Sequence, residues 1–85
     1  MSEELGQLIG KITHFFGHIS VAVIELSENL KVGENIRIVG GGIDFTQPVE
    51  SLEVEHKKVP EAKAGDSVGL KVSEKVHEGY KVYRA

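Results

Sequence analysis

Four histidines are the residues of this chain with the clearest capacity for metal binding or acid–base chemistry. His14 and His18 are four residues apart, a spacing that puts two ligands on one face of a helix. The surrounding sequence favours strand and turn, where this spacing does not bring two rings together. His56 and His77 lie in other segments, without a carboxylate partner that the sequence identifies. Because a closed metal site needs three or four convergent ligands, we interpret the histidines as surface residues and predict no metal site.

The glycine run Gly40–Gly42 is the candidate for a phosphate cradle. A P-loop needs a glycine-rich turn that ends in Gly-Lys-Ser/Thr and opens a helix, whereas a strand-like Ile-Asp-Phe follows here. We therefore interpret the run as a hairpin connection. The serines and threonines lie in predicted strands and loops without a nucleophile elbow, and the chain has no cysteine. With no convergent set of reactive groups, we predict a protein that is not an enzyme and has no cofactor.

A basic segment is the remaining candidate for binding chemistry. It comprises His56, Lys57, Lys58 and Lys63 in a chain whose formal net charge is −3. Two interpretations stay open: a solvated loop, or a contact with an anionic group such as an RNA phosphate. The negative balance argues against strong autonomous binding of nucleic acid, which usually depends on a basic surface.

The elements that must position these residues are short strands rich in Val and Ile. In the segment 67–72, for example, Val68, Leu70 and Val72 alternate with polar residues or glycine and are expected to face the core. No helix of ten residues or more is predicted, and the longest predicted loop covers residues 57–66. We expect strands at 8–15, 19–26, 35–39, 43–46, 49–56, 67–72 and 80–84.

This pattern predicts one all-β domain. Six or seven short strands at such spacing indicate a small antiparallel closed barrel, formed by residues 8–85 after an N-terminal extension of residues 1–7. Gly65 lies where the longest loop enters a strand, so we expect it to take a positive φ that other residues resist.

The N-terminus gives no sign of a targeting segment. Met1–Leu5 lacks the positive charge and apolar run of a signal peptide, and the longest apolar stretch, Val21–Ile24, is far shorter than a membrane span. We expect a soluble, cytoplasmic protein that does not associate with membranes.

The segment Leu52–Leu70 resembles the signature of the second-domain β-barrel of elongation factor Tu-like translation factors. In that family a strand leads through a loop to the pattern A-G-D/E-x-V-G, which Ala64–Gly69 matches. Leu30–Gly40 is similar to another conserved segment of the family, and Gly10–Ile12 and Glu78–Val82 fit its first and last strands. The resemblance covers residues 8–84 and implies a closed barrel of the translation-protein type.

The same resemblance implies a contact with the aminoacyl end of tRNA. The family uses a Glu on the strand before the long loop, matched by Glu53, and a polar residue after A-G-D/E, matched by Ser67 in place of the usual Asn. Because Leu52 and Val54 share the buried face of an alternating strand, we expect Glu53 to project outward. The resemblance implies that it borders a shallow groove that reaches Ser67. Without a P-loop, this chain alone is not expected to bind GTP. The implied contact set, completed by the basic segment, is Glu53, His56, Lys57, Lys58, Lys63 and Ser67.

A second resemblance involves the first strands. Ile9–Val23 looks like the barrel at the C-terminus of collagenase-like peptidase family proteins, whose catalytic parts lie elsewhere. Two functions therefore stay open. The first is a stand-alone, non-catalytic elongation factor-like barrel that binds tRNA, ribosomal RNA or a protein partner supplying catalytic or GTPase parts. The alternative is an accessory subunit or module of a separate peptidase-like or RNA-modifying enzyme.

Overall fold

Short antiparallel strands make up residues 6–85, the part of the chain that the computed structural model describes. This part contains no helix, and therefore none that would cross a membrane. The predicted N-terminal extension, residues 1–7, lies mostly outside it. The strands are β1 (Leu8–Phe16), β2 (Val21–Leu26), β3 (Leu30–Lys31), β4 (Asn35–Gly40), β5 (Ile43–Pro48), β6 (Leu52–Val54), β7 (Lys57–Val59), β8 (Glu61–Ala62), β9 (Ser67–Lys71) and β10 (Lys81–Arg84).

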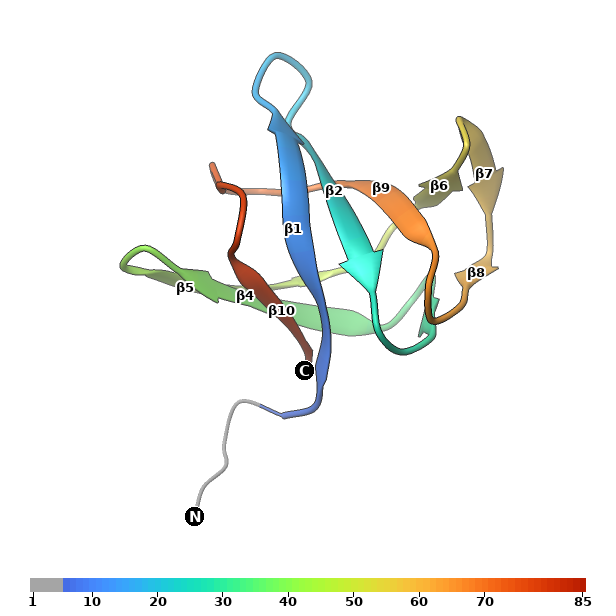
Figure 1. Ribbon diagram of the computed structural model, residues 1–85, viewed down its shortest axis with the longest axis horizontal. Coiled ribbons are helices and arrows are strands. Elements are labelled where there is room, and N and C mark those ends of the chain that lie inside the picture. Colours follow the sequence, from blue (N-terminus) through green and yellow to red (C-terminus); the bar gives the residue numbers. More distant parts are fainter. Residues whose placement is uncertain (1–5) are drawn as a thin grey trace.

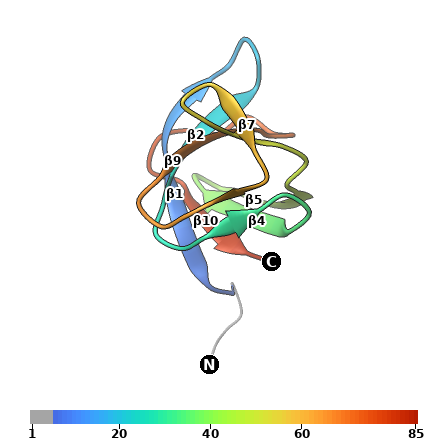
Figure 2. The ribbon, with the colours of Figure 1, turned by 90° about the vertical axis from the view of Figure 1, so that its right-hand side faces the viewer.

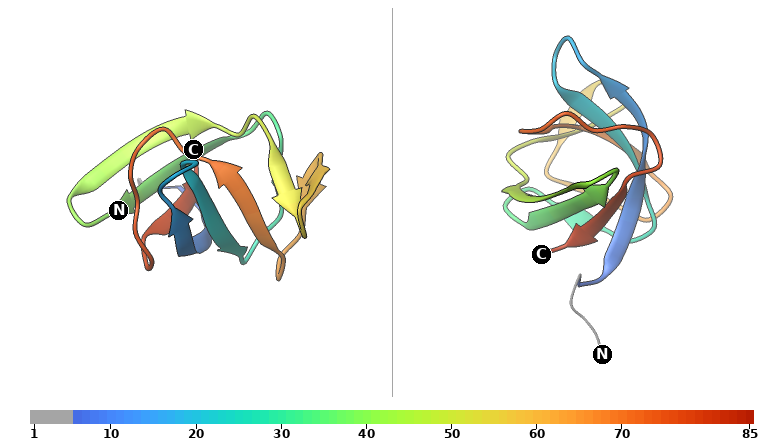
Figure 3. Two further views of the ribbon diagram at one scale, coloured as in Figure 1. Left: turned by 90° about the horizontal axis from the view of Figure 1, so that it is seen from above. Right: turned by 90° about the vertical axis from the view of Figure 1, so that its left-hand side faces the viewer.

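Eight of these strands form one sheet in the order β5-β4-β10-β1-β2-β9-β6-β7, and β3 pairs with β8 in a second, two-stranded sheet. All the pairs are antiparallel. The large sheet curls around its own interior, as Figures 1 and 2 show. The β1–β2 and β4–β5 hairpins extend beyond this curled body (Figure 3).

The interior is filled by aliphatic side chains, mostly β-branched. Alternation along the strands places these residues inward, as predicted for Val68, Leu70 and Val72. The buried core consists of Ile9, Ile12, Ala22, Ile24, Leu26, Leu30, Ile36, Ile38, Val49, Leu52, Ala62, Val68, Leu70, Val72, Val76 and Val82.

The all-β prediction is confirmed, whereas the closed barrel is not. Strands β5 and β7 stand at the two ends of the large sheet and do not pair with each other. Between β5 and β9, the polar link is made by a side chain, Gln47, instead of a backbone ladder. A small domain can curl enough to bury its core without the full set of strand pairs that closure requires.

The segment 49–66 differs most from the prediction. Residues 49–56 were expected to form one strand, but β6 is only Leu52–Val54, and the chain reverses at Glu55 and His56. These two residues take φ values of 53° and 67°, the left-handed conformation of a two-residue hairpin turn. The sequence lacks the usual Asn-Gly signal there, so the turn was missed. In consequence the predicted loop 57–66 contains two strands, β7 and β8.

Candidate functional site

The six predicted contact residues lie around the β6–β7 hairpin and the start of β9. Glu53 is the cross-strand partner of Lys58 on one side and of Gly69 on the other. Ser67 is two residues from Gly69, so Glu53, Lys58 and Ser67 project from the same face of the sheet. All three are exposed. The structure therefore brings the two positions taken from the elongation factor pattern close together, on the outward face.

The rest of the set surrounds this face without forming a pocket. His56 lies in the exposed hairpin turn, and Lys57 is exposed on β7, the terminal strand of the sheet. The Lys63 amide donates to the Asp66 carboxylate at 2.9 Å, which holds the turn before β9. Three cavities lie in other parts of the fold, and none of the six residues lines them. The predicted groove between Glu53 and Ser67 is therefore not among these cavities. Lysines on an edge strand also prevent edge-to-edge association, so their position alone does not define a binding site.

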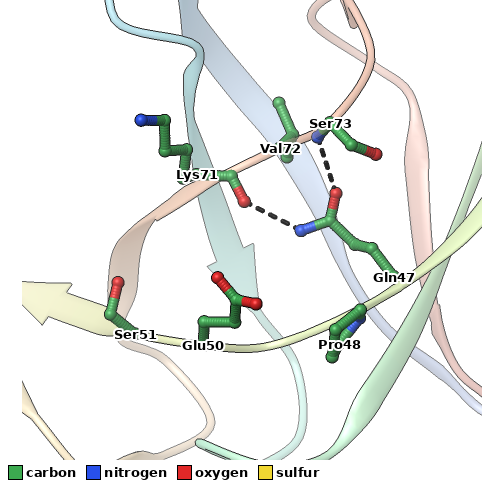
Figure 4. Close-up of a pocket in the computed structure, with 7 residues that line it drawn as sticks. All are labelled: Gln47, Pro48, Glu50, Ser51, Lys71, Val72 and Ser73. Carbon is green, nitrogen blue, oxygen red and sulfur yellow. Dashed lines mark hydrogen bonds between the residues drawn. The ribbon is translucent and has the colours of Figure 1, made fainter.

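A cleft of about 330 Å³ lies instead between the end of β5 and the end of β9. We call it the Gln47 cleft (Figure 4). One wall comes from the segment that leaves β5 and the other from the segment that leaves β9. Its lining residues are Gln47, Pro48, Glu50, Ser51, Lys71, Val72 and Ser73.

The Gln47 carboxamide spans this cleft with two hydrogen bonds. Its Nε2 donates to the Lys71 carbonyl at 2.8 Å, and its Oε1 accepts from the Ser73 amide at 2.8 Å. In a sheet, the backbone N–H and C=O groups of an adjacent β-strand would satisfy these two groups. Gln47 thus joins β5 to the end of β9, where the two strands do not pair.

The cleft contains the polar groups of a binding site. The Glu50 carboxylate and the Ser51 hydroxyl project from the first wall toward the second, whereas the Lys71 ammonium points away from Gln47 (Figure 4). Nucleophilic catalysis needs a hydroxyl hydrogen-bonded to a base. Within residues 6–85 no such bond to the Ser51 or Ser73 hydroxyl is recorded.

No sequence pattern predicts this cleft. Gln47 and Lys71 are 24 residues apart and belong to strands that do not pair. Only the curling of the sheet brings them together, and neither residue belongs to a recognisable motif.

Two of the histidines considered as metal ligands, His14 and His77, make contacts of their own. His14 Nδ1 is 3.5 Å from Glu78 Oε2, and its ring contacts Phe16 with centroids 4.4 Å apart. His77 packs edge-on against Tyr80 and lines an open cavity of about 540 Å³. Within the described residues no group of three or more potential ligands converges.

A strong ion pair stabilises the β4–β5 hairpin, away from the cleft. Arg37 binds the Asp44 carboxylate through two nitrogens, with Nε–Oδ1 at 2.7 Å and Nη2–Oδ2 at 2.5 Å. The hydrogen bond from Arg37 lowers the pKa of Asp44, and the same bond raises the pKa of Arg37. The residues lie directly across from Thr46 and Val39 on the paired strands, which fixes their separation.

Comparisons with known proteins agree with the second resemblance. No established family profile matches the chain. The uncharacterized protease MJ0090 of Methanocaldococcus jannaschii is 41% identical over 76 residues, which are 88% of this chain and 19% of that protein. The chain therefore spans about a fifth of the length of this relative.

Two crystal structures show the same fold. Both are of the C-terminal domain of a Geobacillus thermoleovorans protein designated a U32 peptidase, one of them its selenomethionine variant. Each superposes with a TM-score of 0.87 at 17% and 16% identity, and covers 92% and 100% of this chain and 99% of the solved chain. At this identity the likeness establishes the fold alone. These comparisons do not support the elongation factor Tu resemblance, nor the translation and RNA-binding functions drawn from it.

Proposed function

We propose that the chain is a non-catalytic accessory module of a peptidase-like protein. The observation that carries the proposal is the extent of the likenesses: nearly the whole chain corresponds to a small part of one protease and to an isolated C-terminal domain of another protein. The groups that hydrolyse a peptide bond would then lie in the remaining, larger part of such a protein. The Gln47 cleft supports a binding role, because it offers polar groups without an activated nucleophile.

Binding to a peptidase that lacks its own copy of this domain tests the proposal. The M. jannaschii relative, deleted for its 76 matched residues, is titrated with the purified chain and followed by calorimetry. We expect saturable binding with one chain for each truncated protein, and no hydrolysis of a mixed peptide library by the chain alone. Absence of binding would contradict association with this class of enzyme. Peptide hydrolysis by the chain, abolished by a single substitution, would contradict the non-catalytic assignment.

Total tRNA serves as the competing ligand in the same experiment. An RNA-binding module would bind tRNA with an affinity that falls steeply as salt rises, and Lys57→Gln with Lys58→Gln would weaken that binding. We expect no such binding. The double variant also controls for non-specific attraction, since it should bind the truncated peptidase as the unsubstituted chain does.

A further inference from the structure

A β-bulge near the start of β1 creates a second pocket, on the outer face of the sheet. Between the pairs that Leu8 and Gly10 make with β10, β1 contains one residue more than its partner. Regular alternation would place residues 8 and 11 on opposite faces. The bulge reverses this, so Ile9 and Ile12 are both buried while Leu8 and Lys11 both lie outward. An aliphatic side chain and a cation thus come to the same surface.

Two lysines face each other beside this bulge. Lys11 on β1 is directly opposite Lys81 on β10, and on its other side it is opposite Glu25 on β2. Like charges directly opposite each other destabilise a sheet. Within residues 6–85, neither lysine is within 4.0 Å of a carboxylate oxygen. The cross-strand row Lys81, Lys11 and Glu25 therefore carries an excess positive charge that an anion would neutralise.

The pocket beside these lysines has a volume of about 250 Å³. This is smaller than the ~300–1,000 Å³ typical of sites for drug-sized ligands, and suits a single side chain. Leu8, 46% exposed, supplies the apolar side chain of its lining, beside the methylene stems of Lys11 and Lys81. Leu26 faces the core and is 2% exposed, so it does not offer a side-chain surface here. The lining residues are Leu8, Gly10, Lys11, Glu25, Leu26, Ser27 and Lys81.

We propose that this bulge pocket binds the C-terminus of a peptide whose last side chain is apolar. The side chain packs against Leu8 and the methylene stems of the two lysines, and the terminal carboxylate accepts hydrogen bonds from Lys11 and Lys81. Charge-assisted bonds of this kind are about twice as strong as neutral ones, and an apolar pocket beside them selects the neighbouring group. No aromatic ring lines the pocket on which a nucleic acid base would stack, which favours a peptide. The choice of a peptide also rests on the proposed function, since a module of a peptidase-like protein meets peptide ends.

Amide chemical shifts of the purified chain provide the test. The probe is acetyl-Gly-Gly-Leu with a free carboxylate, compared at constant ionic strength with the same peptide as its carboxamide. We expect saturable shifts at residues 8–11, 25–27 and 81, and binding of the carboxamide weaker by about tenfold or more. Lys11→Gln with Lys81→Gln should weaken binding of the acid to a similar extent. Glu25→Gln should strengthen it, because this change removes a competing carboxylate.

The matched control is Lys57→Gln with Lys58→Gln, which removes the same charge from β7 and should leave binding unchanged. Leu8→Ser should weaken binding of the leucine peptide and have little effect on acetyl-Gly-Gly-Gly. Equal binding of acid and carboxamide, or equal weakening by both lysine pairs, would overturn the proposal. Competition by inorganic phosphate as effective as that of the peptide would also overturn it, since the site would then be a simple anion site. These results leave the peptidase titration unaffected, so failure of this site and failure of the proposed function are distinguishable.

Discussion

At the scale of single residues, this fold depends on a few positions where the backbone or a charge is constrained. Gly65 takes a φ of +94°, as expected for the turn that delivers the chain into β9. Its amide donates to the Leu26 carbonyl at 2.8 Å, which attaches the turn to the end of β2. A Cβ atom added at Gly65 would have no atom within 4 Å beyond its chain neighbours, so the constraint comes from the backbone conformation and not from crowding.

Gly65→Val should therefore lower the free energy of unfolding by about 1 kcal/mol or more, through backbone strain alone. Gly65→Asn should cost less, because asparagine tolerates positive φ better than β-branched residues do. Gly69→Ala is the matched control: its new Cβ would lie 3.5 Å from Val21, an ordinary contact, and should be nearly neutral. Urea denaturation of the three variants measures these differences. Equal losses for Val and Asn would argue against strain at this φ.

The Arg37–Asp44 pair predicts a pH effect at the same scale. Because the hydrogen bond from Arg37 lowers the pKa of Asp44 in the folded protein, the pair stabilises the fold above the unfolded-state pKa. That contribution is lost as the pH falls through the lower, folded-state pKa. A carboxyl-carbon NMR titration should place the Asp44 midpoint below the ordinary value for aspartate, and Arg37→Gln should raise it. An unchanged midpoint in the variant would show that the bond does not form in solution.

At the scale of elements, the most informative feature is how the terminal strand β5 contacts β9. The β5 and β9 strands approach each other without a backbone ladder, and the Gln47 carboxamide satisfies the carbonyl of Lys71 and the amide of Ser73. A side chain in this role holds two elements at a fixed distance while leaving a cleft beside them. The bulge in β1, in the interior of the sheet, also adjusts the fold locally, since it re-aims two side chains without breaking the sheet.

Gln47→Leu should cost about 1 kcal/mol of stability and accelerate hydrogen exchange at the Ser73 amide. Gln47→Glu should cost more at neutral pH, because a carboxylate accepts from Ser73 but cannot donate to the Lys71 carbonyl. Protonation restores a donor, so the deficit of the Glu variant should shrink at acidic pH. Thr46→Val, on the same strand and exposed, is the control and should leave exchange at Ser73 unchanged. If Ser73 exchanges at the same rate in all three variants, Gln47 does not join the two strands.

At the scale of the whole molecule, one side chain ties distant parts of the chain together near the C-terminus. Arg84 on β10 binds Glu34 at 2.6 Å, the Asn29 carbonyl at 2.8 Å and Gln7 at 3.3 Å. The contacts join the last strand to the segment before β1 and to the connection between β2 and β4. The Arg84 and Glu34 side chains are 25% and 32% exposed, so solvent screens their pair only partly.

Arg84→Gln should accordingly lower the free energy of unfolding by about 1–3 kcal/mol. Arg84→Lys should recover only part of this loss, because a single ammonium cannot reproduce the spread of a guanidinium. Lys81→Gln, on the same strand, removes a lysine that forms no ion pair with any of residues 6–85, and should be neutral or slightly stabilising. Thermal unfolding followed by circular dichroism compares the three. Full recovery of stability in Arg84→Lys would indicate that charge alone, and not geometry, matters at this position.

Local sequence patterns were enough to predict the all-β class, most strand positions and the buried face of the segment 67–72. These follow from local alternation of apolar and polar residues and from glycines at turns, which are properties of neighbours in the chain. The β6–β7 turn was missed because Glu55 and His56 adopt left-handed φ values that their residue types seldom signal. Three outcomes depended on the tertiary structure: the sheet does not close, Gln47 joins β5 to the end of β9, and Leu8, Lys11 and Lys81 share a pocket. Those outcomes depend on strand curvature and register between segments far apart in the chain, which no local pattern encodes.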